Sequence, residues 1–277
     1  MMQRENGMRK EAVEMLLVFD IGNTEIKMGV FRDDDLVAYW RMITGSRKTS
    51  DEYGITMLTM LQQKNITPGD IDSIVVSSVV PHIMHSFLNA VRRYIGKEPF
   101  QVAPGIKTGI CIRCDNPKEV GADLIADVSA AYTLYGGPCL VVDFGTATKY
   151  EVITEDGAFV AAVIAPGLGI SAEAMCKSAA QLPAIEIKKP KKILTANTIE
   201  CMQAGLVYGY IGSVEYIITK IKEEMNQEMK VVATGGLGRV IVEETDVIDV
   251  YDPMLTLKGL RVIADKNKLK RDRKSVV

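Results

Sequence analysis

The sequence has no long apolar run, little net charge and few cysteines. No hydrophobic stretch approaches the roughly 18 residues of a membrane-spanning helix, so we expect no membrane association. Lys and Arg number 33 against 35 Asp and Glu, and this balance argues against nucleic-acid binding, which usually shows as a strongly basic domain. The five cysteines, without a recognisable signal peptide, predict reduced thiols in a cytoplasmic protein.

Metal-ligating side chains are also scarce. Cys111 and Cys114 form a single CxxC, and the other three cysteines are scattered singly, so a structural zinc site is not expected. His82 and His85 are the only histidines and follow a proline on an expected helix. With no third ligand nearby, we interpret both as surface residues.

The length of 277 residues favours two domains of roughly 130 residues each. We predict an N-terminal extension over 1–14, domains over 15–137 and 138–266, and a basic tail over 267–277. The boundary falls at Gly136-Gly137-Pro138, a chain-breaking cluster. The extension is polar and mixed in charge, and the tail is interpreted as solvated.

One sequence unit occurs twice, since residues 16–24 return as residues 139–148. Each copy is an apolar run, short enough for a buried strand, that ends in Asp-x-Gly and a small hydroxyl or amide residue. Hairpin patterns follow both copies, and the period then changes to about 3.6. Helices are predicted over 51–63, 82–95, 123–135, 171–180, 198–225 and 255–265, and further strands over 71–76, 230–233 and 247–250. The prediction is an α/β fold of two related domains, each a mixed sheet flanked by helices.

The two Asp-x-Gly units are suited to a nucleoside triphosphate with Mg²⁺. Gly22 permits close backbone approach, the amides and hydroxyl after it can meet phosphate oxygens, and Asp20 can hold the metal or its waters. One such unit is usually an ordinary turn. Two of them, each near the start of a half-length domain, predict a grip on the phosphates from both sides. The glycine-rich residues 233–238 are a candidate adenosine-side loop.

With these residues in view, residues 16–265 resemble the type III pantothenate kinases, members of the actin, sugar-kinase and chaperone-ATPase superfamily. The matching segments run in the family's order: Asp20-Ile21-Gly22-Asn23-Thr24, Ser77-Ser78-Val79-Val80-Pro81, Pro117-Lys118-Glu119-Val120-Gly121-Ala122-Asp123, Asp143-Phe144-Gly145-Thr146-Ala147-Thr148, Ala165-Pro166-Gly167-Leu168, Gln181-Leu182-Pro183 and Asn197-Thr198. The resemblance implies two ribonuclease H-like (actin-like ATPase) domains. It also implies ATP-dependent phosphorylation of pantothenate to 4'-phosphopantothenate, the first step of coenzyme A biosynthesis.

The resemblance also assigns roles to residues. The ATP-binding set would be Asp20, Ile21, Gly22, Asn23, Thr24, Glu25, Ile26, Lys27 and Thr146. Asp143 would bind a monovalent cation, K⁺ or NH₄⁺, and Asp123 would be the catalytic proton acceptor. The substrate-binding set would be Gly121, Ala122, Asp123, Leu124 and Thr198, with Thr198 reaching over from the partner in a homodimer. A carboxylate suits the role of Asp123, because an alcohol attacking the γ-phosphoryl group must lose a proton. Asp123 could also be the N-cap of the helix that begins there.

Four positions depart from the family pattern. Leu124 stands where the family has an arginine that resembles an anchor for the pantothenate carboxylate, and Cys114, Lys149 and Ala196 replace a tyrosine, a threonine and a lysine. A charge-assisted hydrogen bond contributes about 1.5 to 3 kcal/mol, so the lost arginine predicts a roughly tenfold to hundredfold weaker pantothenate site.

Three hypotheses therefore stay open. The first is a pantothenate kinase with a rearranged carboxylate site that uses Lys149 or another cation. The second is a kinase for a related uncharged alcohol, such as a pantetheine-like compound. The third is a nucleotide-binding regulatory protein with little catalysis.

Overall fold

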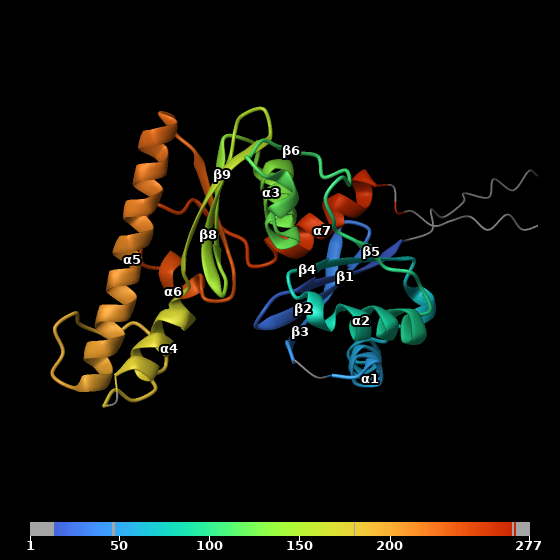
Figure 1. The fold of residues 1–277 in the computed structure, drawn as a ribbon, viewed down its shortest axis with the longest axis horizontal. Coiled ribbons are helices and arrows are strands. Elements are labelled where there is room, and N and C mark those ends of the chain that lie inside the picture. The colour runs from blue at the N-terminus through green and yellow to red at the C-terminus, as the bar shows by residue number, and fades with distance from the viewer. Residues whose placement is uncertain (1–13, 46–47, 180, 268, 270–277) are drawn as a thin grey trace, which may run out of the picture.

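The computed structural model describes residues 14–45, 48–179, 181–267 and 269. Two lobes, each built on one mixed sheet, lie side by side with helices between and around them (Figure 1). Apart from residues 14, 267 and 269, the predicted N-terminal extension and basic tail lie outside the described residues.

The first lobe holds a five-stranded sheet of order β3-β2-β1-β4-β5. Strands β1 and β2 and strands β2 and β3 are antiparallel, whereas β1 and β4 and β4 and β5 are parallel. The strands are β1 Met15–Ile21, β2 Glu25–Arg32, β3 Asp35–Ile43, β4 Ser73–Ser78 and β5 Phe100–Gln101. Helices α1 Ser50–Gln62 and α2 Pro81–Ala90 pack against this sheet in one apolar cluster with β1 and β4.

The second lobe repeats this arrangement in a six-stranded sheet of order β11-β10-β7-β8-β9-β6. Its strands are β6 Cys111–Ile112, β7 Cys139–Phe144, β8 Ala147–Ile153, β9 Ala158–Pro166, β10 Lys230–Thr234 and β11 Val250–Tyr251. Strands β7 to β11 occupy the places of β1 to β5 with the same directions of pairing. The internal sequence repeat is therefore a structural repeat, and the predicted α/β fold of two mixed sheets flanked by helices is confirmed.

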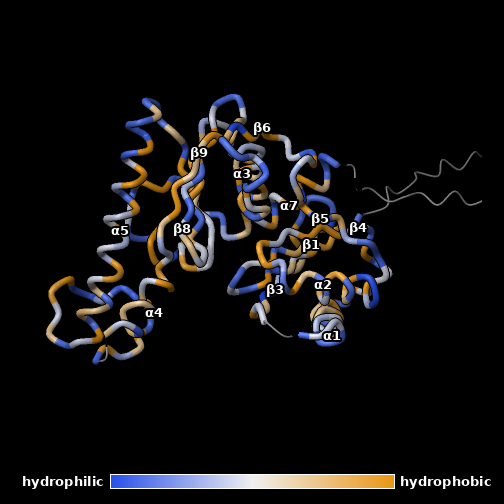
Figure 2. The backbone as a smooth tube through the Cα atoms, viewed as in Figure 1, coloured by the Kyte–Doolittle hydropathy of each residue, from blue (hydrophilic) through white to orange (hydrophobic). Residues whose placement is uncertain are grey.

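Apolar strands buried on both faces anchor each lobe. All seven residues of β1 and all six of β7 are buried, which explains their nearly unbroken apolar sequences. In Figure 2 hydrophobic colour runs through the sheets of both lobes and alternates with hydrophilic stretches. Helices α4 Leu168–Ser178, α5 Thr198–Met225 and α6 Arg239–Val242 cover the second sheet, and their side chains share its apolar cluster.

Helices α3 Ala122–Tyr135 and α7 Leu255–Lys266 lie between the two sheets (Figure 1). Leu257 of α7 and Ile125 of α3 join the apolar cluster of β1, while Leu124 of α3 joins that of β7. Strand β6 joins the second sheet and α7 covers the first, so both cross the boundary expected after residue 137. The division at that residue stays a prediction.

Most predicted elements appear within a few residues of their expected limits. The helix predicted over 82–95 is α2 followed by a π-helical turn over Val91–Ile95, and 3-10 turns occur at Pro68–Asp70 and Pro117–Glu119. The strand predicted over 247–250 is the two-residue β11 instead, and β5, β6 and α6 were not predicted, because so few residues carry no periodicity. None of the described helices has the length and apolar character needed to cross a bilayer.

Candidate active site

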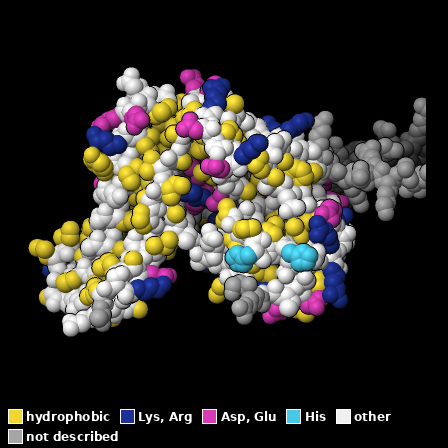
Figure 3. All heavy atoms as spheres, in the orientation of Figure 1, with side chains coloured by type: hydrophobic (Ala, Val, Ile, Leu, Met, Phe, Trp, Pro, Cys, Tyr) yellow, Lys and Arg dark blue, Asp and Glu magenta, His cyan; other side chains and the backbone are white. Residues whose placement is uncertain are grey.

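The two Asp-x-Gly units face each other between the lobes. Thr24 lies in the turn after β1 and Thr146 in the turn after β7, and their Oγ1 atoms are 2.8 Å apart. Asp20 and Asp143 sit near the ends of the two strands, 6% and 8% exposed. Figure 3 shows acidic and basic side chains at the base of the gap between the lobes. The structure thus brings together the two halves of the phosphate grip that the repeat predicted.

The first unit is stabilised by pairs across the β1–β2 hairpin. Asp20 lies opposite Lys27, and the Lys27 Nζ is 3.6 Å from Asp20 Oδ2. Burial raises the pKa of Asp20, and Lys27 partly opposes that rise. Burial also disfavours the Lys27 ammonium, but the Asp20 and Asp143 carboxylates outweigh it and raise the pKa of Lys27. A buried ammonium beside two glycine turns is suited to phosphate oxygens.

The backbone and the apolar residues of the hairpin fix the shape of this turn. The Gly22 N–H donates to the Glu25 carbonyl at 3.0 Å, and the Thr44 hydroxyl donates to the Gly22 carbonyl at 2.7 Å. Ile21 and Ile26 lie opposite each other and are fully buried. The two isoleucines therefore support the loop from beneath, and Asn23 and Thr24 are its exposed part.

Asp123 stands at the start of α3 beside these loops. Its Oδ1 accepts from the Leu124 N–H and its Oδ2 accepts from the Lys149 ammonium, both at 2.8 Å. A Cβ at Gly121 would lie 2.5 Å from Asp123 Oδ1, which explains the glycine there. The N-cap of α3 is Gly121 and not Asp123, so the N-cap interpretation of Asp123 was wrong.

Electrostatics keep Asp123 ionised. Burial raises its pKa, but the charge of Lys149 and the hydrogen bonds from Lys149 and the Leu124 N–H outweigh burial and lower it. The side chain is 25% exposed, so a substrate hydroxyl can approach it. An ionised, accessible carboxylate at a helix start can accept a proton.

Lys149 is the centre of an acidic cluster. It lies opposite Asp143 across the β7–β8 pair, with its Nζ 2.8 Å from Asp143 Oδ2, 2.8 Å from Asp123 Oδ2 and 3.9 Å from Glu151 Oε1. Burial disfavours the ammonium, but the Asp143, Glu151 and Asp123 carboxyls outweigh it and raise the pKa of Lys149. The ammonium is already held by three acidic side chains, so the geometry does not support its use as a replacement for the missing arginine.

Two further acids complete the cluster and were missed by the sequence analysis. Asp127 and Glu151 are fully buried, and in the described part of the chain their carboxyl oxygens lack a hydrogen-bond partner of good geometry. Burial raises the pKa of both carboxyls well above the usual range, with Asp143 adding to the rise at Asp127 and Asp127 adding to the rise at Glu151. Thr256 beside Asp127 only partly offsets this rise. Burial therefore favours the protonated form of both carboxyls.

The signal for these acids was in the spacing. Asp127 lies four residues after Asp123 on the same helix, and Glu151 lies two residues after Lys149 on the same strand. Residues four apart on a helix and two apart on a strand share a face.

The residues predicted to bind the acceptor include apolar ones. Leu124 is 8% exposed and packs with Val128 and Val141, and Cys114 packs against the same cluster. Gly121 and Ala122 are half-buried immediately before Asp123. Two of the four positions that depart from the family pattern, Leu124 and Cys114, thus belong to one apolar cluster.

Thr198 lies elsewhere in the chain. It is exposed at the start of α5, which begins at the outer end of the second lobe, away from α3 (Figure 1). Within one chain the structure therefore brings together the predicted phosphate residues, Asp143 and Asp123, and leaves Thr198 apart.

Several other features lie outside this site. His82 and His85 are exposed on α2 and appear on the surface of the first lobe in Figure 3. The cysteines at 111 and 114 are free thiols. Among the described residues, no group of three or more His, Cys, Asp or Glu side chains is arranged to hold a metal ion.

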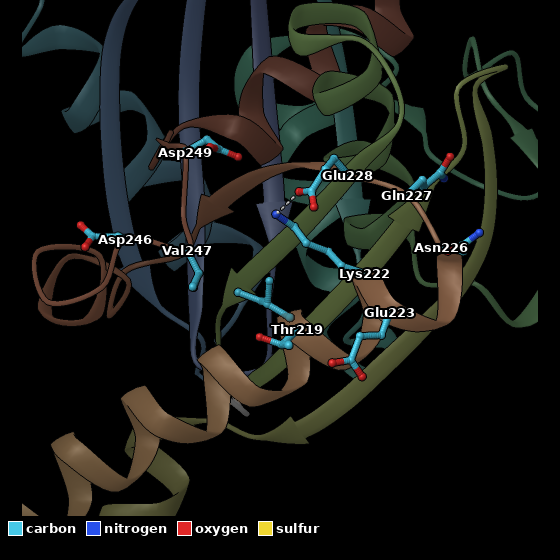
Figure 4. Close-up of a pocket in the computed structure, with 10 residues that line it drawn as sticks. Thr219, Lys222, Glu223, Asn226, Gln227, Glu228, Asp246, Val247 and Asp249 are labelled. Carbon is cyan, nitrogen blue, oxygen red and sulfur yellow. Dashed lines mark hydrogen bonds and ion pairs between the residues drawn. The ribbon is translucent and has the colours of Figure 1, made fainter.

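A hollow of about 600 Å³ lies at the far end of α5 (Figure 4). It is lined by Thr219 and Asn226 among others, and the Lys222 ammonium there pairs with Glu228 at 3.2 Å. Neither Asp-x-Gly loop contributes to it, so it is not the candidate active site.

Sequence comparisons with known proteins point to one family. A family model described as type III pantothenate kinase matches residues 16–220. The type III pantothenate kinase of Agathobacter rectalis is 52% identical over 257 residues, covering 92% of this chain and 99% of the relative. That of Bacillus cytotoxicus is 49% identical over 253 residues, covering 91% and 97%. A solved Baf family protein from Campylobacter jejuni aligns with a TM-score of 0.56 and 20% identity over 91% of this chain and 98% of its own, which shows the fold alone.

Proposed function

The chain belongs to the type III pantothenate kinase family, and from this we propose that it transfers the γ-phosphoryl group of ATP to the hydroxyl of pantothenate. The product is 4'-phosphopantothenate, and the reaction is the first step of coenzyme A biosynthesis. The observation that carries the proposal is the meeting of the two Asp-x-Gly turns at Thr24 and Thr146, beside an accessible Asp123. The family also accounts for the actin-like ATPase arrangement of two repeated lobes.

In this proposal the phosphates of ATP lie between the two turns. Gly22, Asn23 and Thr24 approach them from the first lobe and Thr146 from the second, while the Lys27 ammonium offsets their charge. Glu25, which pairs with Arg41 at 3.5 Å, closes the hairpin. When bound, Mg²⁺ would neutralise charge on the β- and γ-phosphates, and the Asp20 carboxylate fits a role in holding it or its waters.

Asp123 is the proposed proton acceptor. The attacking hydroxyl must lose its proton as the new P–O bond forms and the bond to ADP breaks, and the proton passes to the carboxylate. Lys149 and the Leu124 N–H hold that carboxylate in place, and each of its oxygens keeps a lone pair for the substrate. Such a base contributes roughly 10² to 10⁴ in rate.

We also propose that the protein acts as a homodimer through α5. A Cβ at Gly205, Gly209 or Gly212 would meet nothing among the described residues within 4 Å, so one face of the helix is open for close packing. Leu194, 87% exposed, lies beside that face and helps to line an apolar hollow of about 460 Å³. Because α5 starts far from α3, Thr198 would serve the site of a second copy.

The cytoplasm remains the proposed location. All five cysteines are free thiols, as expected for proteins kept in a reducing compartment.

A second candidate function is phosphorylation of an uncharged alcohol of pantetheine type. It is favoured by the leucine at position 124 and by the apolar cluster that holds Leu124 and Cys114, because apolar side chains do not pair with a substrate carboxylate. A regulatory protein that binds ATP with little turnover is the remaining alternative.

The test is ATP consumption by the purified protein with Mg²⁺ and KCl, in the presence of pantothenate, pantetheine or no acceptor. We expect pantothenate-dependent turnover that falls roughly 10² to 10⁴-fold in Asp123→Asn while ATP binding persists. The exposed Asp156→Asn is the matched control and should leave turnover unchanged. Faster turnover with pantetheine would favour the second candidate, and ATP binding without turnover of either acceptor would overturn both.

A further inference from the structure

The acidic cluster around Asp143 does not fit a free monovalent cation. The Lys149 Nζ lies 2.8 Å from Asp143 Oδ2, which is hydrogen-bonding contact. The same nitrogen is 2.8 Å from Asp123 Oδ2, so it bridges the two carboxylates. An ion bound to Asp143 at that oxygen would meet an ammonium at contact distance and be repelled by it.

The backbone explains why the lysine reaches this point. Strands β7 and β8 are antiparallel, and their register sets Lys149 directly opposite Asp143. The equivalent pair in the first lobe is Asp20 with Lys27, also opposite each other across a hairpin. The Lys149 side chain is only 13% exposed, so packing and charge hold it in place.

The charges of the surrounding groups are consistent with an ammonium at this position. The carboxyls of Asp123, Asp127, Asp143 and Glu151 face it, and the Asp20 carboxyl interacts with both Lys149 and Lys27. Of these, the Asp123 and Asp143 carboxylates lie within hydrogen-bonding distance of the ammonium, each at 2.8 Å. Lys27 lies against Asp20, so Lys149 is the cation that serves Asp123 and Asp143.

We propose that the Lys149 ammonium is a built-in monovalent cation at Asp143, which makes the protein independent of free K⁺ and NH₄⁺. Lys149 is a positioning residue: it holds Asp143 and orients the Asp123 carboxylate that accepts the substrate proton. An alkylammonium group carries the same charge as an ammonium ion and offers one N–H donor fewer. Tethering the group to the chain removes the need to bind a free ion.

The test compares the unaltered protein with Lys149→Thr in KCl, NH₄Cl, NaCl and choline chloride at equal ionic strength. The unaltered protein should give the same thermal midpoint and the same ATP- and acceptor-dependent rate in all four salts, within about twofold. A rate that falls tenfold or more when K⁺ and NH₄⁺ are absent would overturn the proposal. The salt comparison on the unaltered protein tests the proposal by itself, even if the variant fails to fold.

The variant supplies the opposite expectation. In Lys149→Thr the Asp123 and Asp143 carboxylates lose the ammonium between them and repel each other. A free cation can take its place, so the thermal midpoint of the variant should rise as KCl or NH₄Cl is added and rise much less as choline chloride is added. Lys177→Thr, which removes an exposed lysine on α4, is the control and should respond to salt as the unaltered protein does. A variant midpoint that ignores cation identity would contradict the inference.

The inference rests on the proposed kinase function for its rate measurement only. If no acceptor is phosphorylated, the midpoints in the four salts still report on Lys149. The two failures are therefore distinguishable.

Discussion

At the scale of single residues, Glu151 is an acid whose surroundings favour its protonated form. Its pKa is raised well above the ordinary value of 4.5 by burial and by the Asp127 carboxyl. The folded protein therefore keeps a proton that the unfolded chain releases above about pH 4.5. Stability contributed by this group is present below that pH and is lost as the pH rises toward the folded-state pKa.

Glu151→Gln should remove the loss of folding stability that this carboxyl causes as the pH rises. We expect the free energy of unfolding to increase by about 1 kcal/mol or more near pH 8 and by less near pH 5, because one pKa unit is worth about 1.4 kcal/mol. Urea denaturation at the two pH values measures the difference. Glu173→Gln on exposed α4 is the control, with an expected change below about 1 kcal/mol at either pH. A gain that is larger at pH 5 would contradict the assignment of a neutral Glu151.

The sequence predicted some of the site's residues and not others for a definite reason. Asp20, Asp123 and Asp143 stand in short motifs beside glycine, so the local sequence indicates both the backbone turn and the chemical group. Lys149, Asp127 and Glu151 matter through the register of β7 with β8 and the packing of α3, which bring them to one point. Burial of Leu124 likewise depends on which side of α3 meets β7, and that is a property of the assembled lobes.

At the scale of elements, the crossing of α3 and α7 positions Asp123. A Cβ at Gly259 of α7 would lie 1.9 Å from the Ala126 carbonyl oxygen of α3. The contact is with backbone, so a side chain there can be accommodated only by separating the helices.

Gly259→Ala should therefore lower the free energy of unfolding by about 1 to 3 kcal/mol. Because α3 carries Asp123 in its first turn, turnover should fall more than ATP affinity. Thermal denaturation and ATP titration of the same preparation separate the two effects. Among the described residues, a Cβ at Gly169 in α4 would meet only a Leu237 methyl at 3.8 Å, so Gly169→Ala should be neutral or slightly stabilising. Equal stability of Gly259→Ala and the unaltered protein would show that α3 and α7 yield without cost.

Long elements were predicted well because they carry many periods of apolar residues. Helix α5 has the predicted limits of 198 and 225, and α3 differs from its prediction by one residue. Strands β5, β6 and β11 have two residues each and exist only because a neighbouring strand offers hydrogen bonds. Such pairings are set by the fold as a whole and leave no local pattern.

At the scale of the whole molecule, the repeat in the sequence predicted the repeat in space. Each copy of the unit forms the central strand of five strands with the same order, to which the second sheet adds β6, and the two sheets bring their Asp-x-Gly turns together. Helix α7 follows the strands of the second lobe in the chain but packs on the sheet of the first lobe. The sequence did not predict this, because the apolar stripe of α7 would fit either lobe. The number of chains in the working molecule is likewise decided by surfaces, and in the proposed homodimer that surface is the open face of α5.

The proposed dimer makes Gly209 a sensitive position. A Cβ there meets no described atom within 4 Å, so Gly209→Trp should leave the fold of the single chain intact and give a cooperative thermal transition. The indole would keep two α5 helices from close approach, so analytical ultracentrifugation should show the molecular mass fall by half. Turnover should fall with it, because Thr198 of a second copy no longer reaches the acceptor. Glu224→Trp, near the other end of the same helix, adds the same bulk outside the glycine face and should leave both mass and turnover unchanged. A Gly209→Trp protein that stays dimeric and active would place the subunit contact on another surface.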